Sequence, residues 1–169
     1  MFGLEAGVQL DTGAREEDDR LFNRQAYVGL AGKHGSVTLG RQYSLDYLAL
    51  VEVGDPFRGG MAGTATNLVG YSSKRMDDSV RFERNRKGVF TAATYSLRER
   101  ANESRAHRNW GISVGIERGP LVIRAAHQKR NATSTETIMP LGNRYDSRHS
   151  IIAANLRVGP AIAYTAFGI

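Results

Sequence analysis

The chain has 169 residues and a formal net charge of +6, with 19 glycines, 4 prolines and no cysteine. The missing cysteines exclude disulfides, thiol nucleophiles and cysteine metal sites. No stretch reaches the ~18 apolar residues that indicate a transmembrane helix. The many glycines favour strands joined by turns over helices, because a glycine inside a helix costs about 1 kcal/mol relative to alanine.

The strand pattern begins at the N-terminus. In "LEAGVQLD" the apolar residues Leu4 to Leu10 alternate with polar residues or glycine, which is typical of β-strands. The next stretch, "RLFNRQAYVGLAGKHGSVTLGRQY", reads as a hairpin with a tight turn, and Arg24 and Arg41 stand near its far ends. Further along, "WGISVGIE" places Trp110 and three aliphatic residues on one face.

Nine segments with this alternation are predicted to be strands: 4–11, 22–31, 35–42, 77–85, 88–97, 108–118, 120–129, 147–157 and 160–167. Most are longer than the ~5–6 residues of globular strands and approach the ~9–11 residues of a tilted strand that crosses a bilayer. The strand lengths therefore favour a membrane barrel.

The predicted connections alternate strictly between short and long. The short turns are 32–35, 85–88, 118–120 and 158–160, and the long polar loops are 12–21, 43–76, 98–107 and 130–146. All short turns then lie on one side of the sheet and all long loops on the other, as in outer-membrane barrels. The alternative is a soluble β-sandwich that binds polyanions, with the apolar face turned inward.

The basic residues stand singly along the alternating segments. A nucleic-acid-binding protein would gather them into a patch with aromatic residues between them. We therefore expect no nucleic-acid partner.

The 43–76 segment is unusual for a loop. Loops of this length in compact domains are either functional or disordered. Its sequence, "SLDYLALVEVGDPFRGGMAGTATNLVGY", mixes apolar residues with Asp46, Glu52 and Asp55. We expect it to pack against the inner wall of the barrel.

Four stretches, "GLEAGVQLDTG", "FNRQAYVGLAGKHGSVTLGRQY", "GDPFRGG" and "SKRMDDSVRFE", carry a family resemblance that extends over essentially the whole chain. On these stretches the chain resembles the general porins of Gram-negative outer membranes, in their betaproteobacterial type. The resemblance implies an all-β antiparallel transmembrane β-barrel of sixteen strands that forms homotrimers. Residues 1–169 would be a single partial domain of about nine strands, with 43–76 as the inward-folded constriction loop.

The resemblance also implies a set of pore-lining residues. The motif matches place wall arginines at Arg24 and Arg75, and Arg81 shares the parity of Arg75. The facing acids would be Asp46, Glu52 and Asp55. An excess of fixed arginines across a narrow passage favours anions.

Two details complicate this set. Strict alternation would place Val28 and Leu30 on the side of Arg24 unless a bulge intervenes. Arg41 has the parity of Val37 and Leu39, so we expect it at the membrane boundary.

The chain ends also differ from the family pattern. The chain shows neither a signal peptide nor the family's aromatic-ended last strand. We therefore expect an internal fragment or a truncated reading frame, with the function belonging to the complete barrel.

Enzyme signatures are missing from the sequence. The four histidines lack metal-binding spacing, and "GDPFRGGMAG" is not followed by the residues of a phosphate loop. The acids at 16–19 lack the spacing of a calcium loop, although divalent cations could bridge them to lipopolysaccharide. We expect no catalytic residue, no metal and no cofactor.

The sequence therefore predicts a passive outer-membrane diffusion channel for ions and small hydrophilic solutes that prefers anions. Its expected partners are further copies of the chain, outer-membrane lipid and lipopolysaccharide. The alternatives are a non-conducting surface barrel used for adhesion, a truncated porin remnant without function, and a barrel enzyme, which the missing catalytic residues disfavour.

Overall fold

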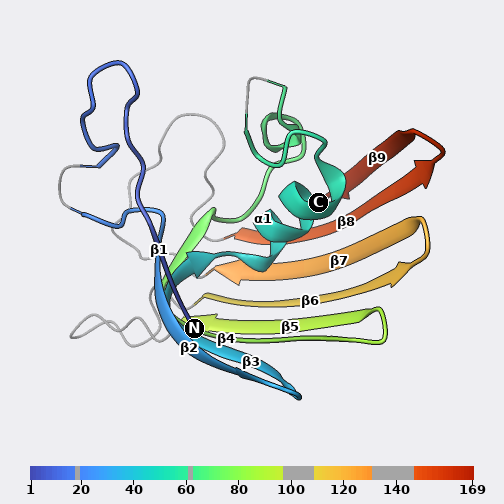
Figure 1. The fold of residues 1–169 in the computed structure, drawn as a ribbon, viewed down its shortest axis with the longest axis horizontal. Helices are drawn as coiled ribbons and strands as arrows, with labels where there is room; N and C mark the ends of the chain where they lie inside the picture. The colour runs from blue at the N-terminus through green and yellow to red at the C-terminus, as the bar shows by residue number, and fades with distance from the viewer. Residues whose placement is uncertain (18–19, 61–62, 97–108, 131–146) are drawn as a thin grey trace.

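The computed structural model describes residues 1–17, 20–60, 63–96, 109–130 and 147–169 (Figure 1). In these ranges nine strands form one antiparallel sheet, and each strand pairs with the next one along the chain. The strands are β1 (Phe2–Glu5), β2 (Gln25–Gly32), β3 (Gly35–Tyr43), β4 (Arg75–Arg86), β5 (Val89–Ser96), β6 (Asn109–Arg118), β7 (Leu121–Arg130), β8 (Ser147–Val158) and β9 (Ala161–Gly168). The predicted all-β antiparallel fold with nine strands is confirmed.

The hairpin turns lie together at one end of the sheet, on the right of Figure 1 for β4 to β9. They join β2 to β3, β4 to β5, β6 to β7 and β8 to β9, each through two residues between the strand ends. The predicted loop 98–107 and nearly all of 130–146 lie outside the described residues. The short turns therefore lie at one end of the strands, and the 43–76 segment starts from the opposite end.

The first strand is shorter than the predicted strand 4–11. After β1 the chain leaves the sheet, and the N–H of Gly7 donates to the buried side-chain oxygen of Asn23 over 2.7 Å. Val8 then forms an isolated antiparallel bridge with Arg15. The alternation from Val8 onward thus belongs to a short hairpin arm outside the sheet, because a period of two does not tell which strand is the partner.

The two faces of the sheet carry different side chains. One row of register partners runs Leu30, Val37, Phe82, Ala93 and Ile112 across β2 to β6. All four large apolar side chains in this row are exposed. The row belongs to the outer face, which carries the apolar residues that the sequence predicted to meet lipid.

A β-bulge interrupts the pairing of β3 with β4 between Gly40 and Gln42. The register there needs one residue more on β4 than on β3, and Asp78 on β4 adopts a φ of 48°. Alternation shifts by one residue at such a bulge. Arg75 and Arg81 are an even number of residues apart, but because the bulge lies between them this spacing does not place them on the same face. Their contacts show which groups each side chain approaches.

The inner face is covered by the 43–76 segment, which folds back over the sheet (Figure 1). It contains the short helix α1 (Leu45–Ala49), the π-helical turn η1 (Leu50–Gly54) and the 3₁₀ turn η2 (Ala65–Asn67). No helix in the described part of the chain is long and apolar enough to cross a membrane.

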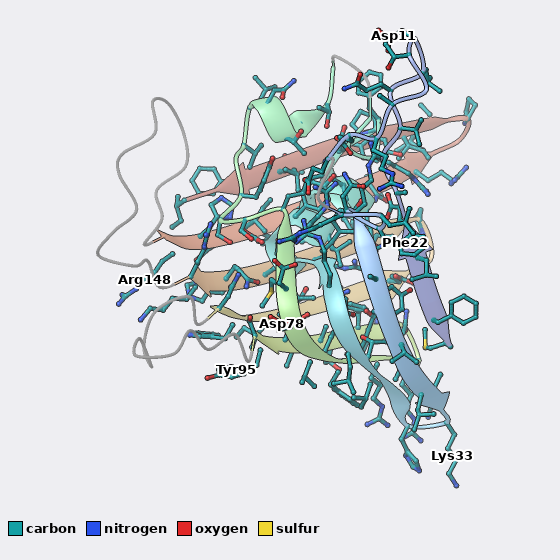
Figure 2. The ribbon with its side chains drawn as sticks, turned by 90° about the vertical axis from the view of Figure 1, so that its left-hand side faces the viewer. Asp11, Phe22, Lys33, Asp78, Tyr95 and Arg148 are labelled. Carbon is teal, nitrogen blue, oxygen red and sulfur yellow. The ribbon has the colours of Figure 1, made fainter. Side chains whose placement is uncertain are left out.

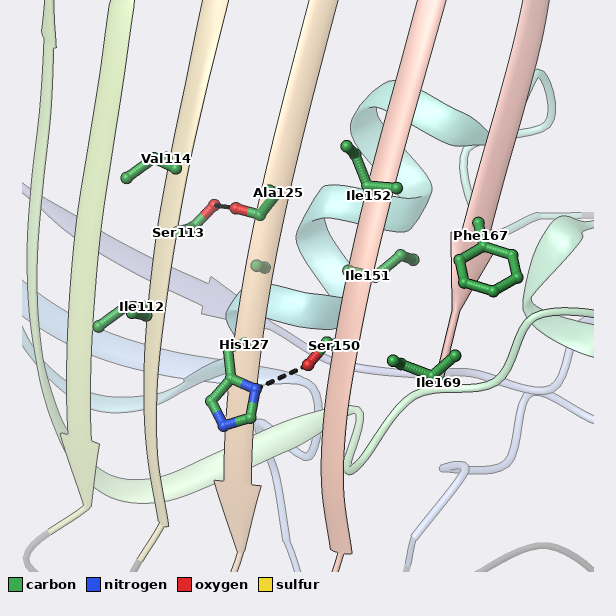
Figure 3. Close-up of a pocket in the computed structure, with 11 residues that line it drawn as sticks. Ile112, Ser113, Val114, Ala125, His127, Ser150, Ile151, Ile152, Phe167 and Ile169 are labelled. Atoms are coloured by element: carbon green, nitrogen blue, oxygen red, sulfur yellow. Dashed lines mark hydrogen bonds between the residues drawn. The ribbon is translucent and has the colours of Figure 1, made fainter.

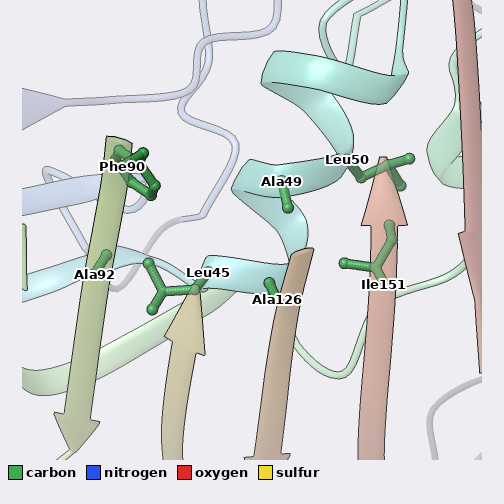
Figure 4. Close-up of a cluster of buried hydrophobic side chains, with 7 residues drawn as sticks. All are labelled: Leu45, Ala49, Leu50, Phe90, Ala92, Ala126 and Ile151. Carbon is green, nitrogen blue, oxygen red and sulfur yellow. The ribbon is translucent and has the colours of Figure 1, made fainter. Parts of the chain in front are cut away.

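The hydrophobic core lies between this segment and the sheet (Figure 4). Its buried members come from α1, η1 and strands β5, β7 and β8: Leu45, Ala49, Leu50, Phe90, Ala92, Ala126 and Ile151. Apolar residues on the inner face of this sheet thus serve to hold the 43–76 segment. The prediction that the segment packs on the inner wall agrees with this arrangement.

Candidate functional site

The 43–76 segment comes into close contact with the sheet at Gly54. A Cβ on Gly54 would lie 2.9 Å from the Cβ of Ala166 and 3.0 Å from that of Ala153. Beside it, the side-chain amide of Asn155 donates to the Val53 carbonyl over 3.0 Å. Residue 54 must be small because the backbone of η1 rests directly on β8 and β9.

Glu52 on η1 forms an ion pair with Arg124 on β7. The Arg124 side chain is 9% exposed and the Glu52 side chain 49%. The Arg124 guanidinium also lies 4.0 Å from the ring centroid of Phe90, a cation–π contact. Glu52 is therefore the acid of the 43–76 segment that meets an arginine of the wall.

Arg124 was not among the predicted site residues. It stands in the middle of a strand, on the same face as Ala126 and Gln128, both of which are buried. An arginine at an inward-facing strand position was the available signal. What the sequence could not supply was its partner, 72 residues away along the chain.

Arg81 on β4 is buried on the inner face and donates a hydrogen bond to the Tyr43 carbonyl. It also interacts electrostatically with Glu83 and Glu52. Arg124 is thus the arginine that pairs with Glu52, and Arg81 adds a second positive charge on the inner face that interacts with Glu52 at longer range.

Asp46 is fully buried at the start of α1. The N–H of Ser72 donates to its carboxylate over 2.7 Å, and Nδ1 of His149 on β8 lies 3.2 Å from the same oxygen. Burial acts to raise the pKa of Asp46, but the hydrogen bonds from His149, Ser44 and Ser72 outweigh burial and lower it. Asp46 ties both ends of the segment and β8 together.

Asp55 follows η1 and is 1% exposed. The N–H groups of Phe57 and Gly59 donate to its carboxylate over 2.9 and 2.8 Å, and the Thr64 hydroxyl donates to it as well. Burial again acts to raise the pKa of Asp55, and these hydrogen bonds, first that from Thr64, lower it. Its carboxylate stabilises the turn in which it lies.

Arg24 lies just before β2, outside the alternation that governs strand positions. Its guanidinium donates to the Glu16 carboxylate over 3.0 Å and lies 3.7 Å from that of Glu5. The hydrogen bond from Arg24 lowers the pKa of Glu16, and a smaller effect in the same direction comes from a hydrogen bond donated by Asn23. Val28 and Leu30 remain exposed on the outer face, so the conflict with alternation does not arise.

Arg75 opens β4 and lies with its guanidinium carbon 5.5 Å from the centre of the Tyr43 ring. The Tyr43 hydroxyl donates to Glu5 over 2.9 Å, and its ring lies 5.2 Å from that of Tyr47 on α1. Arg24 and Arg75 therefore share one cluster with Glu5. The acids of this cluster lie outside the 43–76 segment.

Arg41 is held away from this cluster. Its guanidinium pairs with Asp77 and donates to the Asn23 carbonyl over 2.7 Å, and Asp77 also pairs with Arg20. Its register partner on β2 is Ala26, and the partner of Ala26 on β1 is Leu4. All three positions belong to the outer face. An ion pair thus fixes Arg41 on the outer face, and its place at the membrane boundary stays a prediction.

A pH prediction follows from Asp46 and Asp55. Their pKa values are lower in the folded chain than the ~3.9 of an unfolded chain, so their carboxylates stabilise the docked segment above about pH 4. That stabilisation is lost as pH falls through the lowered pKa values. We expect the segment to loosen as the pH falls below about 4, so that single-channel conductance of the complete protein at low pH differs from its value at pH 7.

The Asp46→Asn, Asp55→Asn variant should have lost most of this pH response. The matched control is Glu117→Gln, on an exposed acid beside a short turn, which should respond as the wild type does. Equal wild-type conductance at pH 7 and pH 3 would contradict the assigned roles of the two aspartates.

Comparisons with known proteins identify the family and the fold. A family model described as Gram-negative porin matches residues 1–168. No curated protein sequence matches the chain. Two solved structures of OmpT, an outer membrane protein of Vibrio cholerae, share the fold at 14% sequence identity.

The match to the loop L8 deletion mutant of OmpT has a TM-score of 0.62 and covers 86% of this chain and 49% of that one. The match to in-vitro folded OmpT has a TM-score of 0.60 and covers 86% of this chain and 46% of that one. This chain therefore spans about half the length of the structures that it matches.

Proposed function

This chain belongs to the Gram-negative porin family and is an outer-membrane protein, and we propose that the whole protein is a passive diffusion channel for ions and small hydrophilic solutes with a preference for anions. The docking of the 43–76 segment on the inner face, with Glu52 against Arg124, is the observation that carries this proposal. In a closed barrel that segment narrows the lumen.

The anion preference rests on the charges that lie where the segment docks on the wall. Asp46 and Asp55 are buried within the segment, which leaves Glu52 as its acid toward the wall. On the wall, Arg124 pairs with that acid and Arg81 adds a second positive charge on the same inner face. Rings of arginine favour anions in a narrow pore. Solutes follow their concentration gradient, and no chemical step is involved.

The proposal includes a complete barrel of sixteen strands and assembly into trimers. These nine strands have two sheet edges, at β1 and β9. Unpaired edges are not tolerated in lipid, so further strands must close the barrel. A second half of similar size fits the half-length match to the solved barrels.

Conductance tests the proposal directly. The complete protein, purified from outer membranes and reconstituted into planar bilayers, should conduct and should show reversal potentials on the anion side in a salt gradient. A barrel used only for adhesion would show negligible conductance, and that result would overturn the channel.

The predicted pair Arg24 and Arg75 gives a second readout. Their replacement by glutamine should lower the anion-to-cation permeability ratio by about twofold. The effect is modest because Arg24 already pairs with Glu5 and Glu16, and partly exposed pairs are screened. Unchanged reversal potentials would remove both residues from the pore lining.

A further inference from the structure

One transverse row of the inner face carries two of the contacts that dock the 43–76 segment. Arg124 in this row pairs with Glu52, and two alanines of the row lie against Gly54, two residues further along the segment. The register partners that form the row, from β5 to β9, are Phe90, Gly115, Arg124, Ala153 and Ala166. The η1 turn is therefore seated on a single row of the sheet.

The neighbours of this row along the chain lie on the other face. Ala125 follows Arg124 and Ile152 precedes Ala153, and both line an apolar groove on the outer face together with Val114 (Figure 3). Since successive side chains of a strand point to opposite faces, Arg124 and Ala153 point inward. Arg124 is accordingly buried where it meets the segment.

The row lies nearer to the short turns than to the long loops. Figure 2 shows Tyr95 at the end of the sheet away from the Lys33 turn. Phe90 is the second residue of β5 after its short turn, and Tyr95 is the last but one. In a closed barrel, a charge held in this row thus lies within the lumen and not at the mouth on the long-loop side.

The side chain of Arg124 reaches across a whole strand. Neighbouring strands are about 4.8 Å apart, so the backbones of β5 and β7 are separated by roughly 10 Å. The guanidinium carbon nevertheless lies 4.0 Å from the ring centroid of Phe90 on β5. The strand between them has a glycine in this row, and a Cβ on Gly115 would lie 3.5 Å from the Cα and the Cβ of Arg124. Glycine in a strand often marks such a close approach, and here it leaves the space through which the guanidinium passes.

Phe90 holds the guanidinium better than an aliphatic side chain would. The face of an aromatic ring attracts a cation, and a guanidinium is planar and weakly hydrated, so it stacks on such a face. This attraction is largest where water is excluded, and both Phe90 and Arg124 are buried. The ring on one side and Glu52 on the other thus hold the charge of Arg124 on the wall.

We propose that Phe90 is a specificity-determining residue of the channel, which acts by positioning Arg124 across the gap at Gly115. Without the ring, the guanidinium follows the half-exposed Glu52 side chain into water, where its field is screened. The effect on specificity rests on the anion preference of the proposed function, whereas the placement of Arg124 does not.

Phe90→Leu in the complete protein tests this role, because it keeps an apolar side chain and every charge but removes the ring. The anion-to-cation permeability ratio from reversal potentials should fall by about twofold, since one wall charge is then displaced and screened. Phe90→Tyr restores an aromatic face and should recover the wild-type ratio. The matched control is Phe82→Leu, on the outer face of β4, which should leave the ratio unchanged.

A double-mutant cycle separates the positioning of Arg124 from a general effect on the core. In an Arg124→Gln background, Phe90→Leu should cause no further fall in the ratio. Phe90 also belongs to the core that holds the segment, and a detached segment would raise single-channel conductance and be cleaved faster by protease. Phe90→Leu should change neither. An unchanged ratio in Phe90→Leu, or an equal fall with and without Arg124, would overturn the proposal.

The side chain of Arg124 gives a readout that does not need conductance. In NMR spectra of the complete protein, the ring current of Phe90 should shift the Nε–H signal of Arg124. Phe90→Leu should abolish this shift and Phe90→Tyr should keep it, and a wild-type signal without the shift would overturn the placement. A protein that shows the shift but has no anion preference would refute the proposed selectivity, and with it the role of Phe90 in specificity, while the placement of Arg124 would stand.

Discussion

The double variant Arg81→Gln, Arg124→Gln is expected to lose most of the anion preference of the channel. A unit charge about 8 Å from a passing ion contributes ~1 kcal/mol at an effective dielectric constant near 40, between the values for water and for a protein surface. Since 1 kcal/mol corresponds to about a fivefold change in an equilibrium, the anion-to-cation permeability ratio should fall at least about fivefold. Reversal potentials across bilayers with unequal salt concentrations measure this ratio.

The opposite change gives a second arm of the same test. Glu52→Gln removes the acid that pairs with Arg124 and should raise the ratio. The matched control is Arg84→Gln, Arg118→Gln, which removes two charges from outward-facing register positions and should leave the ratio unchanged. Because Arg124 is mostly buried, Arg124→Lys serves as a folding control that keeps the charge. An unaltered ratio in the Arg81 and Arg124 variant would exclude these residues from selectivity.

The second large effect concerns the docking of the 43–76 segment. Replacing Leu45 and Leu50 by alanine removes two side chains that are 1% and 0% exposed in the core between the segment and the sheet. Each such change costs about 2–5 kcal/mol. The segment should detach from the wall, so single-channel conductance should rise and protease should cleave the segment faster.

Leu68→Ala is the control for this experiment. Leu68 lies in the same segment but is 87% exposed, so its truncation should alter neither conductance nor cleavage. Heat-modifiable mobility in gels checks that the barrel of each variant remains folded. A double variant that keeps wild-type conductance despite faster cleavage would show that the docked segment does not narrow the lumen.

The sequence alone predicted the sheet well because alternation is local. Trp110 to Ile116 and the row from Leu30 to Ile112 read as one apolar face, and the structure places them on the outer face. The N-terminus shows where local pattern fails. Val8 continues the alternation of β1 but pairs with Arg15 in a separate hairpin, and period two cannot distinguish these partners.

The site required the tertiary structure. Asp46 and His149, like Glu52 and Arg124, come from distant parts of the chain and meet only because α1 and η1 lie on β7 and β8. Residues 43–76 were correctly predicted to pack inward, from length and mixed composition. Which acids would be buried could not be predicted, because Asp46, Glu52 and Asp55 carry the same charge and their hydrogen-bond donors and ion-pair partners are known only from the structure.

The sequence by itself thus determined the strands, the lipid-facing side and the family, since these depend on period-two patterning and short motifs. The tertiary structure alone decided that Asp46 and Asp55 hold the segment while Glu52 meets Arg124. It also showed a bulge between Gly40 and Gln42, opposite the part of β4 that joins Arg75 to Arg81. Because of this bulge, the even spacing of the two arginines does not put them on the same face of the sheet. The physical reason is that burial, ion pairing and register depend on contacts between residues far apart in the chain.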